Sequence, residues 1–176
     1  MKDDLLGYVT SILTTTAHRW LSLASSLPDD LLRLSPARGE WSAADCLYHL
    51  YSTELNVFPL RVRLFLEGRD FPAYNPDQAE AEREDIPVVQ LAEEFARLRA
   101  GTLELLATVR EEHLDARVRH SELGPVTLRE MLNEWAAHDL MHTVQAERAI
   151  MQTFVRASGP WRGYFADHDV DNGAPR

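Results

Sequence analysis

The sequence predicts an all-α protein that folds as a single four-helix bundle. Four long segments repeat apolar residues at steps of three and four, the spacing that gathers side chains on one face of an α-helix. Polar stretches, most of them containing proline, separate these segments. A chain of 176 residues can bury about 70% of its unfolded surface as one domain. We therefore expect one domain over residues 1–166 and a flexible tail over residues 167–176.

The first two helices have recognisable boundaries. Pro28 stops the first, whose inward face carries Leu5, Val9, Ile12, Thr16, Trp20, Leu23 and Leu27. The second begins after Ser42, an N-cap residue; Asp45 can complete a capping box, and Trp41 is placed to pack onto Cys46. The inward face of this second helix consists of Cys46, His49, Leu50, Thr53, Val57, Leu60 and Leu64, with Gly68 near its end.

A long polar segment, Glu67 to Pro87, follows the second helix and is too long for a tight hairpin, so we expect it to carry the chain back along the bundle. The inward face of the third helix consists of Val88, Leu91, Phe95, Leu98, Thr102, Leu105 and Val109. Residues 118–126 carry a strand-turn signal, and Thr127 with Glu130 forms a capping box for the fourth helix. The inward face of the fourth helix consists of Leu128, Met131, Trp135, His138, His142, Gln145 and Ala149.

The composition excludes several classes of function. The chain has 18 Lys and Arg against 28 Asp and Glu and no basic run, which disfavours nucleic-acid binding. No apolar stretch approaches membrane-spanning length, and the N-terminus lacks the basic start and apolar run of a secretion signal. The single cysteine, Cys46, excludes an intrachain disulfide framework and fits a reducing compartment. We expect a cytoplasmic protein that binds neither nucleic acid nor a membrane.

Three histidines stand where a buried helix face normally carries Leu or Ile. His138 and His142 lie one helical turn apart on the fourth helix, about 6 Å along its axis, and His49 lies on the inward face of the second. Three imidazoles leave an incomplete shell on Zn²⁺ or Ni²⁺, which water or substrate would fill. The alternative is that each histidine is a hydrogen-bonded core residue. Three unpartnered imidazoles would cost about 1 to 3 kcal/mol each, which favours shared metal ligation.

Each of four other side chains near these histidines has two possible roles. Gln145 and Thr53 each fall about one turn from a proposed ligand, so they are our candidate catalytic residues because they could hydrogen-bond a water held by the metal; both also suit a wet bundle end. Glu134 and Asp45 precede His138 and His49 by four, the spacing for a carboxylate that receives an imidazole N–H, although capping or solvation explains them equally well.

The remaining candidates are easier to assign. Cys46 lies three residues before His49 and could be a fourth ligand, but a small buried hydrophobic role is favoured. The other histidines have no partner at helical spacing, and we interpret them as surface or loop residues: His18, His113, His120 and His168.

Short motifs near the histidines resemble those of the DinB/YfiT-like superfamily. They are Glu40-Trp41-Ser42 followed by His49-Leu50, and His138-Asp139-Leu140-Met141-His142 followed by Gln145 and Arg148. The resemblance covers nearly the whole chain as an ordered set of four helices. It implies an up-down-down-up bundle, with the segment from Glu67 to Pro87 as the crossover between helices 2 and 3. It also implies a divalent-metal site whose histidines match His49, His138 and His142.

The resemblance implies several activities on small molecules. Relatives include thiol transferases that use bacillithiol or mycothiol, a mycothiol-dependent isomerase, and many proteins described only as metal-dependent hydrolases. Arg148 is our candidate for binding a low-molecular-weight thiol, and Arg61 and Arg63 could help if they face the pocket. We expect a metal-dependent thiol transferase or hydrolase that forms a homodimer. The alternatives are a non-catalytic metal-binding or stress-associated protein, and a dimeric helical module with structural histidines.

Overall fold

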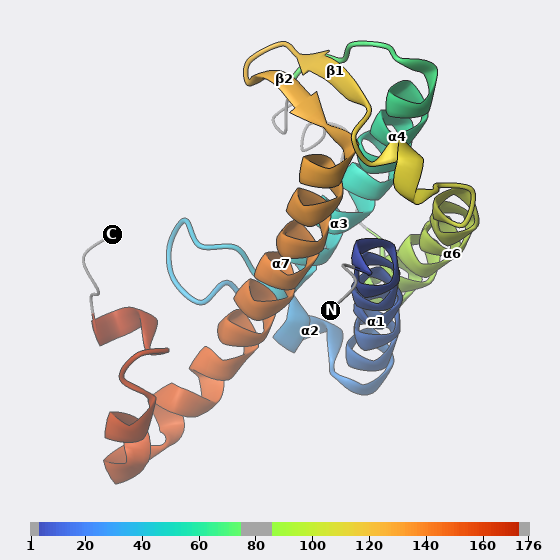
Figure 1. Ribbon diagram of the computed structural model, residues 1–176. Coiled ribbons are helices and arrows are strands. Elements are labelled where there is room, and N and C mark those ends of the chain that lie inside the picture. The colour runs from blue at the N-terminus through green and yellow to red at the C-terminus, as the bar shows by residue number, and fades with distance from the viewer. Residues whose placement is uncertain (1–3, 75–85, 173–176) are drawn as a thin grey trace.

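The computed structural model describes residues 4–74 and 86–172, and it confirms the predicted four-helix bundle (Figure 1). The long helices are α1 (Leu5–Ser26), α3 (Ala43–Asn56) continued by α4 (Phe58–Glu67), α6 (Val88–Leu106) and α7 (Leu128–Ala157). A short helix, α2 (Asp29–Leu32), follows Pro28. None of the helices within the described ranges has the length and apolarity needed to cross a bilayer.

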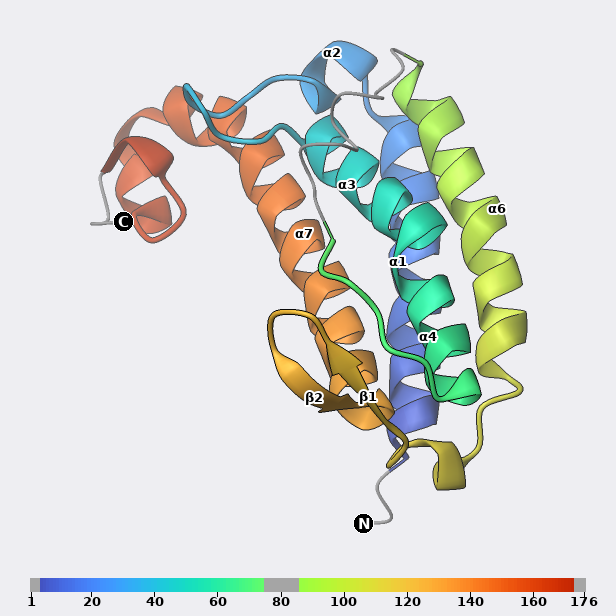
Figure 2. The same ribbon diagram turned by 90° about the horizontal axis from the view of Figure 1, so that it is seen from above.

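The direction of each helix follows from the two clusters that make up the core. One end of the bundle joins the start of α1, all of α4, the end of α6 and the start of α7, where Leu5, Val62, Leu106 and Leu128 pack together. The other end joins the end of α1 and the starts of α3 and α6 to the middle of α7. Figure 2 shows the same arrangement: α1 and α7 run one way, and α3, α4 and α6 run the other way.

The second helix is broken, which corrects the prediction of one continuous helix. Val57 separates α3 from α4 and has φ −123° and ψ −75°, outside helical values. Pro59 explains the break, because proline lacks the amide hydrogen that would continue the helix and its ring clashes with the preceding turn. The break lies beside the histidines, because Phe58, the first residue of α4, stacks on Trp135 and makes an edge contact with the His138 ring.

The predicted capping boxes are confirmed at both helix starts. The hydroxyl of Ser42 accepts the amide of Asp45, whose carboxylate accepts the Ser42 amide in return. Thr127 and Glu130 make the same pair of bonds at the start of α7. These caps fix the first turns of the two helices that carry the histidines.

A β-hairpin precedes α7, as the strand-turn signal predicted. Strands β1 (Arg117–His120) and β2 (Gly124–Thr127) pair antiparallel, with Val118 opposite Val126. The chain leaving α4 joins this hairpin, because the Phe71 amide donates to Arg119 and the Ser121 amide donates to Phe71. Beyond it, the Tyr74 hydroxyl lies 3.0 Å from the Ser52 hydroxyl of α3. The central part of the predicted crossover, residues 75–85, lies outside the described residues.

The first residues of the expected flexible tail, 167–172, make specific contacts with α7 and with the segment that precedes them. Two 3₁₀ helices, Gly159–Phe165 and Val170–Asn172, follow α7. Asp169 is buried and pairs with Arg162, and the Gln152 amide donates to the His168 carbonyl. These polar contacts hold the segment where the sequence offered no apolar pattern. Residues 173–176 of the predicted tail lie outside the described residues.

Candidate metal centre

The three predicted histidines meet at one point between α3 and α7. His49, His138 and His142 each offer a ring nitrogen, and the three nitrogens lie within 4.8 Å of one another. The Nε2 atoms of His49 and His138 are 3.0 Å apart. Two nitrogens on one tetrahedral Zn²⁺ lie about 3.4 Å apart, because each metal–nitrogen bond is about 2.0 to 2.1 Å long. The cluster is thus close to the spacing that one divalent ion requires.

Burial keeps the three imidazoles neutral, which is the form that binds metals. Loss of solvent, aided by the neighbouring imidazole of His142, lowers the pKa of His49 to about 4. Burial first, and then the neighbouring rings and Arg99, lower the pKa of His138 to about 3. Burial also lowers the pKa of His142, although its hydrogen bond to Gln145 opposes the shift. All three rings therefore have a lone pair available at neutral pH.

Gln145 contacts a histidine of the cluster directly. Its Oε1 lies 3.0 Å from Nδ1 of His142, one turn earlier on α7. The amide oxygen can only accept, so Nδ1 of His142 carries the hydrogen and Nε2 is left as the nitrogen that can face a metal. Gln145 therefore orients the His142 ring, a contact that sequence spacing alone did not specify.

Trp41 covers the cluster from outside. Its ring stacks on His142 at 5.5 Å between centroids and 18° between planes, and it lies 5.2 Å from the His49 ring. The capping box at Ser42 fixes the residue before the helix and so places this indole. The expectation that Trp41 packs onto Cys46 did not include these two ring contacts. The contact with His142 could not be predicted from helical spacing within one segment, because His142 lies on α7.

Thr53 and Arg148 each make protein contacts that were not predicted from the sequence. The Thr53 hydroxyl donates to the carbonyls of His49 and Leu50, so its proton is used within α3, although its side chain lines the cavity described below. Arg148 donates to the His168 carbonyl and does not line that cavity. Its guanidinium holds the C-terminal segment, which sequence spacing along one helix could not reveal.

The structure also bears on the alternatives at Cys46, Asp45 and Glu134. Cys46 is fully buried, and burial with the charge of Asp45 raises its thiol pKa to about 12, so it behaves as a small apolar residue. Asp45 serves the capping box. Within the described chain, Nδ1 of His138 has no hydrogen-bond partner, so Glu134 does not receive it.

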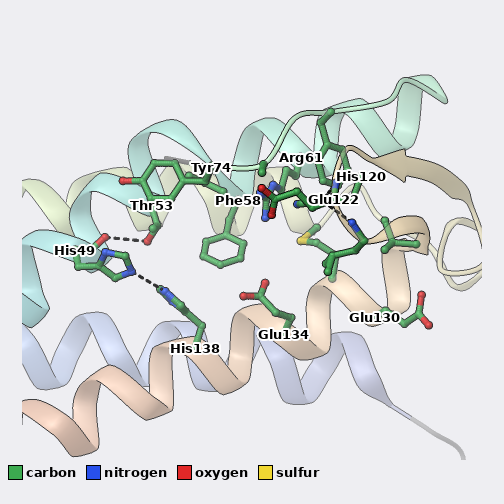
Figure 3. Close-up of a pocket in the computed structure, with 16 residues that line it drawn as sticks. His49, Thr53, Phe58, Arg61, Tyr74, His120, Glu122, Glu130, Glu134 and His138 are labelled. Atoms are coloured by element: carbon green, nitrogen blue, oxygen red, sulfur yellow. Dashed lines mark hydrogen bonds between the residues drawn. The ribbon is translucent and has the colours of Figure 1, made fainter. Parts of the chain in front are cut away.

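A cavity of about 430 Å³ opens beside the cluster and extends toward the hairpin (Figure 3). His49 and His138 lie at one end, and Arg61, His120 and Glu122 lie toward the other. Thr53, Phe58, Tyr74 and Glu134 also line it, as do Val57, Phe71, Ala73, Leu123, Val126, Glu130 and Met131. Two of the three clustered histidines, His49 and His138, thus border a space that can hold a small organic molecule.

His120 was wrongly interpreted as a surface or loop residue. It is buried, its ring packs edge-on against Phe71, and its Nδ1 accepts the amides of Glu122 and Leu123. Its neutral form therefore carries the hydrogen on Nε2. The signal was present in the alternation of β1, where Val118 and His120 face the same side.

A buried ion cluster lies behind the histidines. Arg99 of α6 contacts Asp139 at 2.7 Å and Glu54 at 2.9 Å, and all three side chains are at most 1% exposed. Arg99 also donates to the Leu13 carbonyl, so it links α6 to α1, α3 and α7 at the level of the histidine cluster. Burial raises the pKa of both carboxyl groups, while the guanidinium opposes that shift.

Comparison with known proteins agrees with this fold. The DinB superfamily model matches residues 12–146, and the chain belongs to that superfamily. The structure is similar to that of YfiT from Bacillus subtilis, with a TM-score of 0.70 over 88% of this chain and 89% of that chain, at 17% sequence identity. YfiT is described as a probable metal-dependent hydrolase with an unusual four-helix bundle topology. No curated protein matches the sequence.

Proposed function

We propose that the protein is a metal-dependent hydrolase whose centre is one divalent ion, Zn²⁺ or Ni²⁺, held by His49, His138 and His142. The observation that carries the proposal is that three ring nitrogens lie within 4.8 Å of one another, and that two of the three histidines, His49 and His138, line a cavity. Within the described chain, no Cys, Asp or Glu completes this group. A three-histidine set leaves a position for substrate or water, which is the pattern of catalytic rather than structural sites.

The residues of the chain would prepare the site for reaction. An ion bound here would supply Lewis acidity, which generates a nucleophile at neutral pH. Gln145 fixes the ring of His142, and the capped start of α3 holds His49 under Trp41. Phe58 packs against the His138 ring, and Trp41 packs against the rings of His49 and His142. This support holds the ligands in place without rearrangement during the reaction.

The cavity favours hydrolysis over transfer of a low-molecular-weight thiol such as bacillithiol or mycothiol. Of the three arginines considered for binding the carboxylates of such a thiol, only Arg61 lines the cavity. Arg63 is exposed on α4, and Arg148 is engaged with the C-terminal segment. The description of YfiT as a probable metal-dependent hydrolase supports the same choice.

The experiment is an activity screen on protein purified without an affinity tag and reloaded with Zn²⁺ or Ni²⁺. Ester and amide hydrolysis are measured beside transfer of thiols to electrophiles. We expect hydrolysis that is lost with a chelator, restored by metal and absent in His142→Ala, with His18→Gln unchanged because His18 is exposed on α1. Thiol transfer without hydrolysis would support the transferase instead, and no metal-dependent turnover would support a non-catalytic role.

A further inference from the structure

Two side chains of opposite charge line the cavity without forming an ion pair with each other. Arg61 of α4 and Glu134 of α7 interact electrostatically, but among the described residues neither makes a hydrogen bond or an ion pair within 4.0 Å. Arg61 instead lies over the Phe71 ring, 4.9 Å from its centroid. Stacking occupies the face of a guanidinium and leaves its N–H edges to donate. In Figure 3, Glu134 extends from α7 into the space between His138 and Arg61.

Both charges lie at the same level of the bundle, about one helical turn from the metal centre. The reference point is the contact of the Phe58 and His138 rings, 5.2 Å between centroids. Arg61 follows Phe58 by three residues and Glu134 precedes His138 by four, on helices that run in opposite directions. Three residues of helix rise about 4.5 Å and four rise about 6 Å, so both steps lead toward the hairpin by a similar amount.

The other charged residues of the wall are less suited to hold a ligand. The Glu130 carboxylate is bound by the amide and hydroxyl of Thr127, and Glu122 is exposed. The cavity that Arg61 and Glu134 line also has apolar residues in its wall, among them Val57, Phe58, Phe71, Val126 and Met131. Burial lowers the pKa of Arg61 and raises the pKa of Glu134, so each charge would gain from a partner of opposite sign.

We propose that this part of the cavity binds a substrate with an α-amino-acid head group, its carboxylate on Arg61 and its ammonium on Glu134, and its side chain directed at the three histidines. A ligand with only one charge would meet one partner and one repelling group. A zwitterion satisfies both, and the separation of one turn suits a side chain whose reacting atom lies three or four bonds from Cα. The assignment rests on the proposed function, since it places this side chain at the proposed metal centre.

The test uses three probes with the same hydrocarbon chain: L-norleucine, hexanoate, which lacks the amine, and pentylamine, which lacks the carboxylate. Binding is measured by isothermal titration calorimetry on the zinc-loaded protein. A hydrogen bond to a charged group contributes about 1.5 to 3 kcal/mol, which is roughly tenfold or more in affinity. We therefore expect L-norleucine to bind at least about tenfold more tightly than either analogue.

Variants decide whether the named residues are responsible. Arg61→Gln and Glu134→Gln should each remove the preference for L-norleucine, while Arg63→Gln, an exposed position on the same helix, should keep it. Equal binding of hexanoate or pentylamine, a preference that survives both variants, or no binding of L-norleucine would overturn the proposal. Because neither residue is a metal ligand, the preference should persist in metal-free protein. If the preference for L-norleucine is present but no metal-dependent turnover is found, the proposed hydrolase activity is rejected and the proposed binding site is retained.

Discussion

Acid should destabilise the metal-free protein through its neutral histidines. The folded-state pKa values of His49 and His138, about 4 and about 3, lie below the ordinary value of 6.5. The unfolded chain therefore takes up protons at a pH where the folded protein does not. Above pH 6.5 these histidines do not reduce the free energy of unfolding. As the pH falls below 6.5 the free energy of unfolding decreases, and this decrease ends only below the folded-state pKa values.

The magnitude follows from the distance below 6.5. At pH 5 each of the two histidines should lower the free energy of unfolding by roughly 2 kcal/mol, because one pKa unit corresponds to about 1.4 kcal/mol. The sum of about 4 kcal/mol is a large part of the stability of an ordinary domain, about 5 to 15 kcal/mol. Burial also lowers the pKa of His142, which adds to the loss in the same direction.

The assay is urea unfolding followed by circular dichroism at pH 7 and pH 5, after treatment with a chelator. The double variant His49→Gln, His138→Gln serves as the reference, because the buried carboxyl groups of Glu54 and Asp139 also titrate and shift stability in the opposite direction. We expect wild type to lose about 4 kcal/mol more than the variant between the two pH values. An equal loss in both proteins would refute the assignment of buried, neutral histidines.

Three further predictions concern the supports of the site. Chelation at pH 7 should leave the helical circular dichroism unchanged, because the two apolar clusters supply the core; its loss would indicate a structural metal. Arg99→Met should destabilise the protein by about 3 to 5 kcal/mol in urea unfolding, and adding Glu54→Gln with Asp139→Asn should recover much of that loss. Gln145→Ala should weaken metal binding by about 10- to 100-fold in competition titrations, whereas Gln145→Glu, which keeps the acceptor, should not.

Much of the fold could be predicted because each helix carries its own local signals. The capping boxes at Ser42 and Thr127 and the stop at Pro28 depend on residues a few positions apart, and all three were readable from the sequence. The break at Val57 was missed although Pro59 stood in the sequence, because the apolar spacing continues across it. A pattern of apolar residues reports which face is buried and says little about the continuity of the backbone.

The site was predictable only where one helix face defined it. His138 and His142 share a face of α7, and His49 shares the inward face of α3, so their meeting followed from the bundle itself. His120 reaches the cavity through the hairpin, and the opposition of Arg61 and Glu134 depends on how α4 lies against α7. Such contacts are long-range, and no spacing within one segment encodes them.

Metal content tests the central claim most directly. Protein purified without an affinity tag is reloaded with Zn²⁺ or Ni²⁺, freed of excess ion by gel filtration and analysed by inductively coupled plasma mass spectrometry. We expect one ion per chain in wild type and almost none in His49→Ala, His138→Ala or His142→Ala, with His18→Gln retaining the full amount. Retention of the ion by all three alanine variants, or no binding by the wild type, would contradict the three-histidine centre.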